Sequence, residues 1–332
     1  MSDEAQPSEE EPIHAELSSD YGEPTLGGER FSPVDEASEN SLFEARPAQA
    51  SPEIVFAPPV IRTPNIVDAL LFLALLILGL VVTAAGLGIA IYAHLLQSWF
   101  GLKDFEAAAN DTRIALGTQM LIYLVGLGGA VPLFRAAWHK NFFDGLHWQA
   151  PTAWRLRYRL VATAIFCNLL AMVGNAVLPF PKHAPIDKMF STERDAWLLM
   201  SFGVLVAPFF EEMIFRGFLL PAMATAWDWC GEKLTQSAPR PLDSQEQPQW
   251  SMSAQVFAAL FVSVPFALMH SAQVGSAWGP VSLLYCVSLV LCAVRLITRS
   301  LAASTMVHAT YNLALFAVMM AETDGFRHLD KL

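Results

Sequence analysis

The stretch WLLMSFGVLVAPFFEEMIFRGFLLPAMATA, residues 197–226, is long and apolar enough to cross a membrane as a helix, yet it contains three charged side chains. On insertion scales, each charge at the centre of such a helix costs about 2.5–3.5 kcal/mol. We therefore expect Glu211, Glu212 and Arg216 to face the interior of a helix bundle, where they can satisfy one another. This stretch predicts the fold class and, within it, a buried polar site.

The whole chain has the composition of a polytopic membrane protein. Of its 332 residues, 54% are hydrophobic and 15% are charged, and the mean hydropathy is +0.40. Seven apolar segments are long enough, or nearly so, to cross the hydrocarbon, and they lie at about 67–97, 114–134, 160–178, 197–226, 254–269, 280–297 and 301–320. We expect an all-α transmembrane helix bundle with about seven spanning helices, and eight as the alternative.

The net charge of −11 belongs to the N-terminal part of the chain. Residues 1–63 contain fourteen Asp and Glu but three Lys and Arg, together with many Ser and Pro. Such a segment buries too little apolar surface to offset its ordering entropy. We expect a disordered acidic tail at 1–63, a transmembrane helical domain at 64–322 and a short C-terminal tail at 323–332. The acidic tail is expected to be a solvated extension, and a partner-binding role is the alternative.

Lys and Arg are most frequent between the second and third apolar segments, where the chain has Arg135, Lys140, Arg155, Arg157 and Arg159. Positive charge marks the cytoplasmic side of a membrane protein. This loop and the N-terminus are therefore expected in the cytoplasm. The basic and aromatic stretch RAAWHKNFFDGLHW in the same loop is typical of a helix that lies at the membrane interface.

The spacing of the three charges suggests different roles for the two glutamates. Glu212 and Arg216 are four residues apart with the glutamate first, which is the favourable order for an ion pair on one helical face. Glu211 points about 100° away from that face, so we expect it to meet polar groups on other helices. Pro208 leaves a backbone carbonyl without its donor, which predicts a bend beside the site.

Two other apolar segments carry polar groups at helical spacing. FALMH in the fifth segment places Phe266 and His270 four residues apart, and HATYN in the seventh does the same for His308 and Asn312. A single buried histidine is more often a hydrogen-bonded core residue than a reactive one. An unpaired glutamate, two histidines and an asparagine on three otherwise apolar helices are not explained by ion pairing, so they predict a reactive centre.

The motifs EEMIFRG, FALMH and HATYN, in this order along the chain, resemble those of the CAAX protease and bacteriocin-processing family of intramembrane endopeptidases. The resemblance covers about 197–312, which we therefore expect to be the catalytic core. It implies that Glu211 is the general base that activates water, and that His270 orients this water or binds a metal. It also implies that His308 and Asn312 bind the oxyanion or complete a metal site.

The same resemblance implies supporting roles for the other motif residues. Glu212 and Arg216 would hold the fourth helix in place, and Phe266 would pack near His270. Zinc bound by His270 and His308 is the expected metal if one takes part, since zinc takes three protein ligands and an open position for water. The chain has no HExxH helix, and one glutamate cannot easily serve as both ligand and base, so the sequence leaves metal dependence open.

The expected function is hydrolysis of peptide bonds in membrane-embedded or membrane-anchored substrates, within the lipid bilayer of a bacterial inner membrane. The active-site groups do not select a prenylated substrate over a plain transmembrane peptide. The alternatives are a non-catalytic scaffold or immunity protein of the same family, and a proton-coupled transporter, because buried Glu and His also line ion paths. We expect no organic cofactor and no nucleic-acid partner, and the sequence identifies no partner for the tail.

Overall fold

The computed structural model describes residues 62–179, 181, 185–244 and 247–331. These residues form helices joined by short loops, and no strand occurs among them. The acidic tail predicted at 1–63 lies outside the described residues except for its last two positions. The transmembrane bundle predicted from the apolar segments is confirmed.

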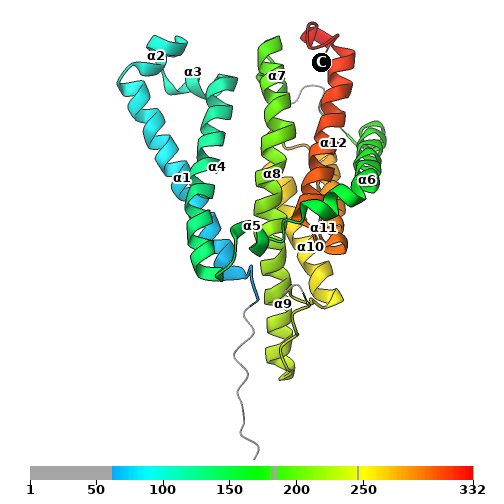
Figure 1. Ribbon diagram of the computed structural model, residues 1–332. Coiled ribbons are helices and arrows are strands. Elements are labelled where there is room, and N and C mark those ends of the chain that lie inside the picture. The colour runs from blue at the N-terminus through cyan, green and yellow to red at the C-terminus, as the bar shows by residue number, and fades with distance from the viewer. Residues whose placement is uncertain (1–61, 180, 182–184, 245–246, 332) are drawn as a thin grey trace, which may run out of the picture. The chain divides into compact units, whose positions relative to one another are not determined.

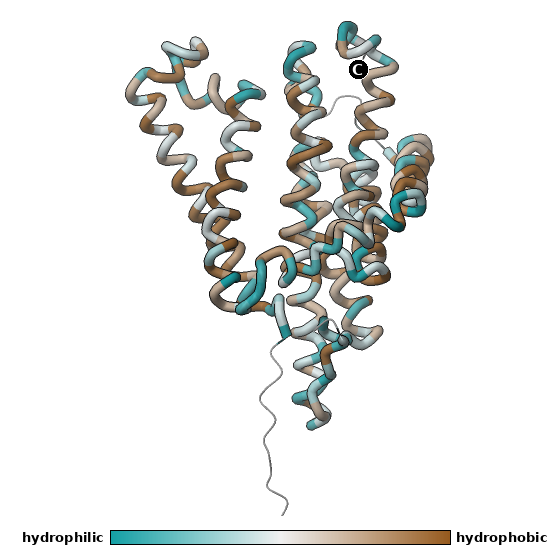
Figure 2. Tube along the Cα trace, viewed as in Figure 1, coloured by the Kyte–Doolittle hydropathy of each residue, from teal (hydrophilic) through white to brown (hydrophobic). Residues whose placement is uncertain are grey.

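Among the residues that the structure describes, seven helical runs are long and apolar enough to span a membrane (Figure 1). They are α1 (Ile66–Tyr92), α4 (Thr112–Trp138), α6 (Ala150–Val177), the continuous run Glu193–Thr235, α10 (Met252–Met269), α11 (Trp278–Thr298) and α12 (Leu301–Glu322). Figure 2 shows hydrophobic residues along the middle of these helices and hydrophilic residues towards their ends. The chain is therefore an integral, multi-pass membrane protein.

Short helices connect the spans. They are α2 (Leu95–Phe100), α3 (Phe105–Asn110), α5 (Phe142–Gly145) and the 3₁₀ turn η1 (Pro185–Met189), and a further 3₁₀ turn, η4 (Leu329–Lys331), follows the last span. Polar side chains that precede a span can cap its N-terminal end. Asp111 does so for α4, because it accepts hydrogen bonds from backbone N–H groups in the first turn of this helix. The Arg113 side chain also donates to Asp111, which holds the pKa of this carboxyl below its usual value.

The spans pack in two groups that meet at the long run Glu193–Thr235. Helices α1 and α4 pair with each other, and both contact this run. Helices α6, α10, α11 and α12 form the other group, in which α6 packs along α12 and α10 lies against α11 (Figure 1). The run therefore lies between the two groups, where its side chains can meet residues from both.

The run Glu193–Thr235 has two π-helical turns. It is made of α7 (Glu193–Ser201), the π turn η2 (Phe202–Val206), α8 (Ala207–Glu212), the π turn η3 (Met213–Leu219) and α9 (Leu220–Thr235). Each π turn inserts an extra residue and shifts the helical face, and such turns are frequent at functional sites. Where the sequence predicts a bend at Pro208, the structure has a π turn that ends just before this proline.

Two loop predictions differ from the structure. The stretch RAAWHKNFFDGLHW is not one helix: its first four residues end α4, Phe142–Gly145 form the short α5, and Leu146 after it is buried. Helix α6 begins at Ala150, ten residues before the predicted start, because the arginines that end the apolar pattern are still helical. In the predicted C-terminal tail, Phe326 is buried and its ring packs edge-on against Trp197.

Aromatic packing connects α1 and α4 to the run that carries the charged motif. The ring of Phe218 on η3 stacks on Phe72 of α1, with 4.2 Å between ring centroids, and packs against Phe134 and Trp138 of α4. Aromatic pairs of this kind add stability beyond the apolar area that they bury. The cluster holds η3 in place immediately after Glu211 and Glu212.

Candidate active site

Glu211, on α8, lies between two imidazoles. Its Oε2 is 3.7 Å from Nε2 of His270 and 3.6 Å from Nε2 of His308. The glutamate is 7% exposed, so its carboxyl is almost removed from solvent. The structure brings these three residues, from α8, the end of α10 and α12, around one carboxylate oxygen.

The two histidines meet because α10 and α12 are offset along their axes. His270 follows the last residue of α10, eighteen residues from its start, whereas His308 is the eighth residue of α12. If α10 and α12 began at the same depth, the helical rise of about 1.5 Å per residue would separate the two imidazoles by roughly 16 Å. The start of α10 must therefore lie farther out than that of α12, which the long α9 before it permits.

Hydrogen bonds orient both imidazoles in the same way. The Nδ1 of His270 is 2.9 Å from the carbonyl oxygen of Phe266, and the Nδ1 of His308 is 3.0 Å from Oε1 of Glu212. Carbonyl and carboxylate oxygens accept hydrogen bonds, so each Nδ1 is the donor. In the neutral imidazole, each Nε2 then presents a lone pair towards Glu211. The distances to Glu211 exceed a direct hydrogen bond and suit a bridging water.

The buried pair of Glu212 and Arg216 supports this arrangement. Arg216 donates to Oε1 of Glu212 at 2.9 Å, and neither side chain has any exposed surface. The same guanidinium donates to the backbone carbonyl and the hydroxyl of Ser288 on α11, at 3.0 and 2.7 Å. Since Glu212 also accepts from His308, one network connects η3, α11 and α12.

Phe266 packs against the polar groups of the site. Its ring lies 4.4 Å from the guanidinium carbon of Arg216, in a cation–π contact. The same ring is 5.0 Å from the imidazole of His270 and 5.8 Å from that of His308, measured between centroids. Phe266 therefore restricts both imidazoles, in addition to its backbone contact with His270.

Asn312 lies on the same side of α12 as His308, but its amide is turned towards η2. Its Nδ2 donates to the carbonyl oxygen of Gly203 at 2.7 Å. In a π turn, this carbonyl would receive the N–H of the residue five positions later, which is Pro208 and has none. Asn312 supplies the missing donor. No contact between Asn312 and Glu211 occurs among the described residues.

Sequence reasoning missed two polar residues near the site. One is Ser288, described above, and the other is Tyr123 of α4, which accepts a hydrogen bond from Gln119 at 2.8 Å. The Tyr123 ring stacks on Phe210, next to Glu211, with 4.3 Å between centroids, and its hydroxyl interacts electrostatically with Glu211. Both residues lie outside the three motifs, in apolar segments where a lone polar residue gives no signal.

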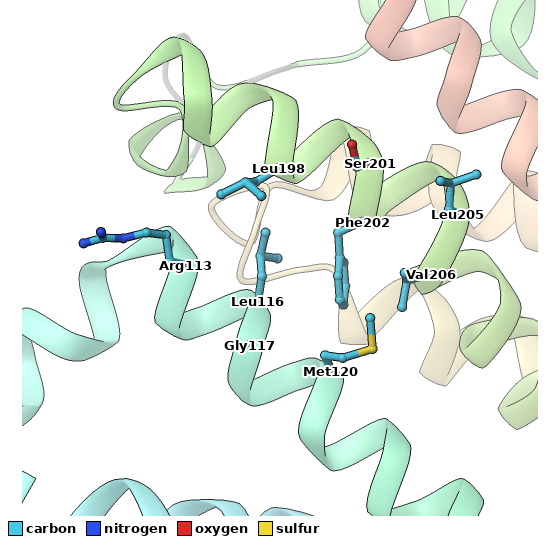
Figure 3. Close-up of a pocket in the computed structure, with 9 residues that line it drawn as sticks. All are labelled: Arg113, Leu116, Gly117, Met120, Leu198, Ser201, Phe202, Leu205 and Val206. Atoms are coloured by element: carbon cyan, nitrogen blue, oxygen red, sulfur yellow. The ribbon is translucent and has the colours of Figure 1, made fainter. Parts of the chain in front are cut away.

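An apolar cavity of about 470 Å³ lies between α4 and the α7–η2 part of the run (Figure 3). It is lined by Arg113, Leu116, Gly117, Met120, Leu198, Ser201, Phe202, Leu205 and Val206. The ring of Phe202 is stacked 6.4 Å from Tyr123, between centroids, and η2 leads directly into α8. The cavity therefore adjoins the side of the site that faces α4.

The donor atoms at the site are of types that zinc accepts, namely two imidazole nitrogens and a carboxylate oxygen. The other nitrogen of each imidazole bonds to a carbonyl or carboxylate oxygen, as is usual for histidines that bind a metal. In the described part of the chain, however, no group of three or more His, Cys, Asp and Glu is arranged to hold a metal ion.

The comparison with protein families agrees with the motif order. Residues 193–314 match the family model described as Type II CAAX prenyl endopeptidase Rce1-like. The comparisons with curated proteins and with solved structures found no match. The matched segment contains Glu211, His270 and His308, the three residues that meet at the carboxylate. Residues 193–314 are therefore similar to the Rce1-like domain of type II CAAX prenyl endopeptidases, a protease family.

Proposed function

We propose that this chain is an intramembrane endopeptidase in which Glu211 activates water for attack on a peptide bond. The observation that carries the proposal is the position of the Glu211 carboxylate, 3.6–3.7 Å from two imidazole nitrogens that are both oriented by hydrogen bonds behind them. The similarity of this segment to a protease family supports the same reaction.

In the proposed mechanism, Glu211 is the general base. A water held between its Oε2 and Nε2 of His270 donates one proton to Glu211 as its oxygen attacks the carbonyl carbon. The C–N bond then breaks, and Glu211 returns the proton to the leaving amine. His270 suits the orienting role because its Nδ1 donates to a neutral carbonyl, which leaves Nε2 as an acceptor for the second water proton.

The oxyanion needs a donor on the other side of the reacting carbonyl. We assign this role to His308, because its Nε2 lies 3.6 Å from Glu211 while its Nδ1 is held by the carboxylate of Glu212; an Nε2–H at this position would donate to the oxyanion. Asn312 keeps a second amide N–H beyond the one that it donates to Gly203, and we infer that it assists His308. Glu212, Arg216 and the ring of Phe266 keep the imidazoles in place.

We propose that the substrate is a membrane-embedded or membrane-anchored peptide whose apolar part occupies the cavity between α4 and η2. The cavity walls are almost entirely apolar, and they belong to two spanning segments. A prenyl chain or an apolar peptide segment would gain the same hydrophobic burial there. Arg113 at the rim would face an anionic group or a lipid phosphate.

The metal expectation remains a separate proposal. His270 and His308 would hold zinc, and the third donor beside them is the carboxylate of Glu211, which cannot easily be both ligand and base. We therefore derive hydrolysis from the protein side chains alone. A metal analysis, described in the Discussion, tests the alternative.

We propose that the N-terminus and the loop between α4 and α6 lie on the cytoplasmic side of a bacterial inner membrane, because Lys and Arg gather in this loop.

The function itself is tested with purified protein in liposomes and fluorogenic peptides that carry an apolar anchor. Glu211→Gln should abolish cleavage while the unfolding temperature stays near that of the wild type. Cleavage by this variant at the wild-type rate would refute the proposal.

A further inference from the structure

A second buried charge lies away from the reactive centre, near the C-terminal end of α11. Arg295 is 2% exposed, and its Nε is fully buried without a hydrogen-bond partner. Among the described residues, its guanidinium forms no hydrogen bond or ion pair. Burying an unpaired charge is costly, and arginine cannot avoid the cost by losing its proton. A site of this kind suits an anion that is absent from the protein itself.

Arg295 lines a cavity of about 210 Å³ between α11 and the segment that precedes α10. The cavity is lined mainly by polar side chains, among them Arg299, Gln249 and Gln255. Arg299 also lines a neighbouring cavity of about 350 Å³, to which α6 contributes Arg155. Together the two cavities are lined by three arginines, and Arg299 lines both.

Within the described part of the chain, acidic residues do not balance this charge. Asp243, which pairs with Arg299, is the one acidic side chain among the described residues that line the two cavities. His147 lies nearby and is uncharged near neutral pH, because burial and then Arg295 lower its pKa to about 3. The region therefore has an excess of positive charge with glutamine amides beside it.

The cavity is separate from the proposed catalytic centre. Arg295 follows Ser288, the partner of Arg216, by seven residues, which is about 10 Å along α11. Between them, Leu291 and Cys292 are fully buried and fill the space between the helices. A peptide bound at Glu211 would not reach the cavity through this layer.

The position of the cavity indicates the kind of anion. It lies where α10 begins and α11 ends, and the apolar side chains of Met252 and Ile297 beside it are 73% and 82% exposed. Such a polar cavity at helix ends, next to exposed apolar residues, is at the level of lipid headgroups. Arginine binds phosphate through paired N–H donors, and amides can complete the contact.

We propose that the cavity formed by Arg295, Arg299 and Gln255 binds a phosphate group, supplied by an anionic lipid headgroup or by free phosphate. The test uses the full chain in a neutral detergent and measures its unfolding temperature. One arm adds inorganic phosphate, and acetate at equal ionic strength is its control. A second arm adds phosphatidylglycerol, and diacylglycerol, which has no phosphate, is its control.

Phosphate, phosphatidylglycerol or both should raise Tm by about 2–4 °C in a saturable manner, whereas the controls should not. A response to inorganic phosphate alone identifies a soluble ligand, and a response to phosphatidylglycerol alone identifies a headgroup. No response in either arm, or an equal response to acetate, would overturn the proposal. None of these outcomes depends on the proposed protease activity.

Three variants assign the response to the cavity. Arg295→Gln should abolish it and also raise Tm without added anion, because it removes the unpaired charge. Gln255→Glu should have a similar effect by supplying a counterion within the cavity. Arg135→Gln, which removes an exposed charge at the end of α4, should respond like the wild type. A full response in Gln255→Glu, or in Arg295→Gln if it folds, contradicts the proposal.

Discussion

The Nδ1 of His308 donates to Oε1 of Glu212 across 3.0 Å, and this hydrogen bond joins the buried ion pair to the reactive centre. Glu212 accepts from Arg216 with the same oxygen. Adjacent glutamates therefore have different environments, since one is neutralised within the protein core and the other faces two imidazoles. The difference leads to separate expectations for the two residues.

Glu212→Gln should lower the stability of the protein by about 3–5 kcal/mol, because it leaves the guanidinium of Arg216 buried without its counterion. Glu211→Gln has no such partner to lose and should change stability little. Chemical or thermal unfolding in detergent measures both. Equal stability loss in the two variants would contradict the division of roles. Adding Arg216→Met to Glu212→Gln should recover part of the loss.

Asn312→Ala should lower kcat by about 10²-fold, because it removes a donor near the oxyanion and frees the Gly203 carbonyl. Pro208→Ala restores a backbone N–H five residues after Gly203 and can satisfy that carbonyl. The two changes together should therefore cost less than the sum of their separate effects on stability. A double-mutant cycle measures the coupling, and strict additivity would show that Asn312 does not replace the missing N–H.

His147 should make the protein less stable in acid. Its pKa is lowered to about 3 in the folded state, first by burial and then by Arg295, while the unfolded chain has the ordinary value near 6.5. Below pH 6.5 the unfolded state therefore binds more protons, and stability falls as the pH decreases towards 3. The slope reaches about 1.4 kcal/mol per pH unit.

Unfolding measured from pH 7.5 to pH 4.5 checks this expectation, with His147→Gln as the comparison. The glutamine variant should have a shallower loss of stability over the same range. Parallel pH profiles for the variant and the wild type would show that His147 is not the responsible group.

Part of the geometry around Glu211 is predictable from the sequence, because helical spacing determines which side chains share a face. Glu212 and Arg216 are four residues apart, as are Phe266 and His270, so their contacts follow from one helix at a time. Membrane insertion also strongly restricts where an unpaired glutamate such as Glu211 can face.

Contacts between helices were harder to predict. The offset of α10 against α12 depends on how far α9 extends beyond the hydrocarbon, and hydropathy does not report this distance. The hydrogen bond from Asn312 to Gly203 depends on a π turn, which has no sequence period of its own. Ser288 is one polar residue in an apolar helix, so its partner is apparent only once α11 is packed.

Filling the apolar cavity should weaken substrate binding without changing the chemistry. An added Cβ at Gly117 meets no atom within 4 Å, so Gly117→Trp can direct its ring into the cavity without a clash at its base. KM for peptides with an apolar anchor should rise several-fold while kcat stays near the wild-type value. Gly128→Trp, at an open position elsewhere on α4, is the matched control. Equal effects of the two variants would assign the cavity no role in binding.

Chelation and metal analysis test whether zinc takes part in the proposed hydrolysis. Under the mechanism derived above, protein treated with a strong chelator should keep its activity and contain less than one metal ion per chain. Elemental analysis and activity before and after chelation give the answer together. Loss of activity that zinc restores would instead show that His270 and His308 act as ligands.

The most direct test of water activation by Glu211 is a single turnover in ¹⁸O-labelled water, followed by mass spectrometry of the product and of the protein. One labelled oxygen is expected in the new C-terminal carboxylate of the cleaved peptide, and none in Glu211. Label in the Glu211 side chain would show that this carboxylate attacks the peptide itself, and it would contradict the role of general base.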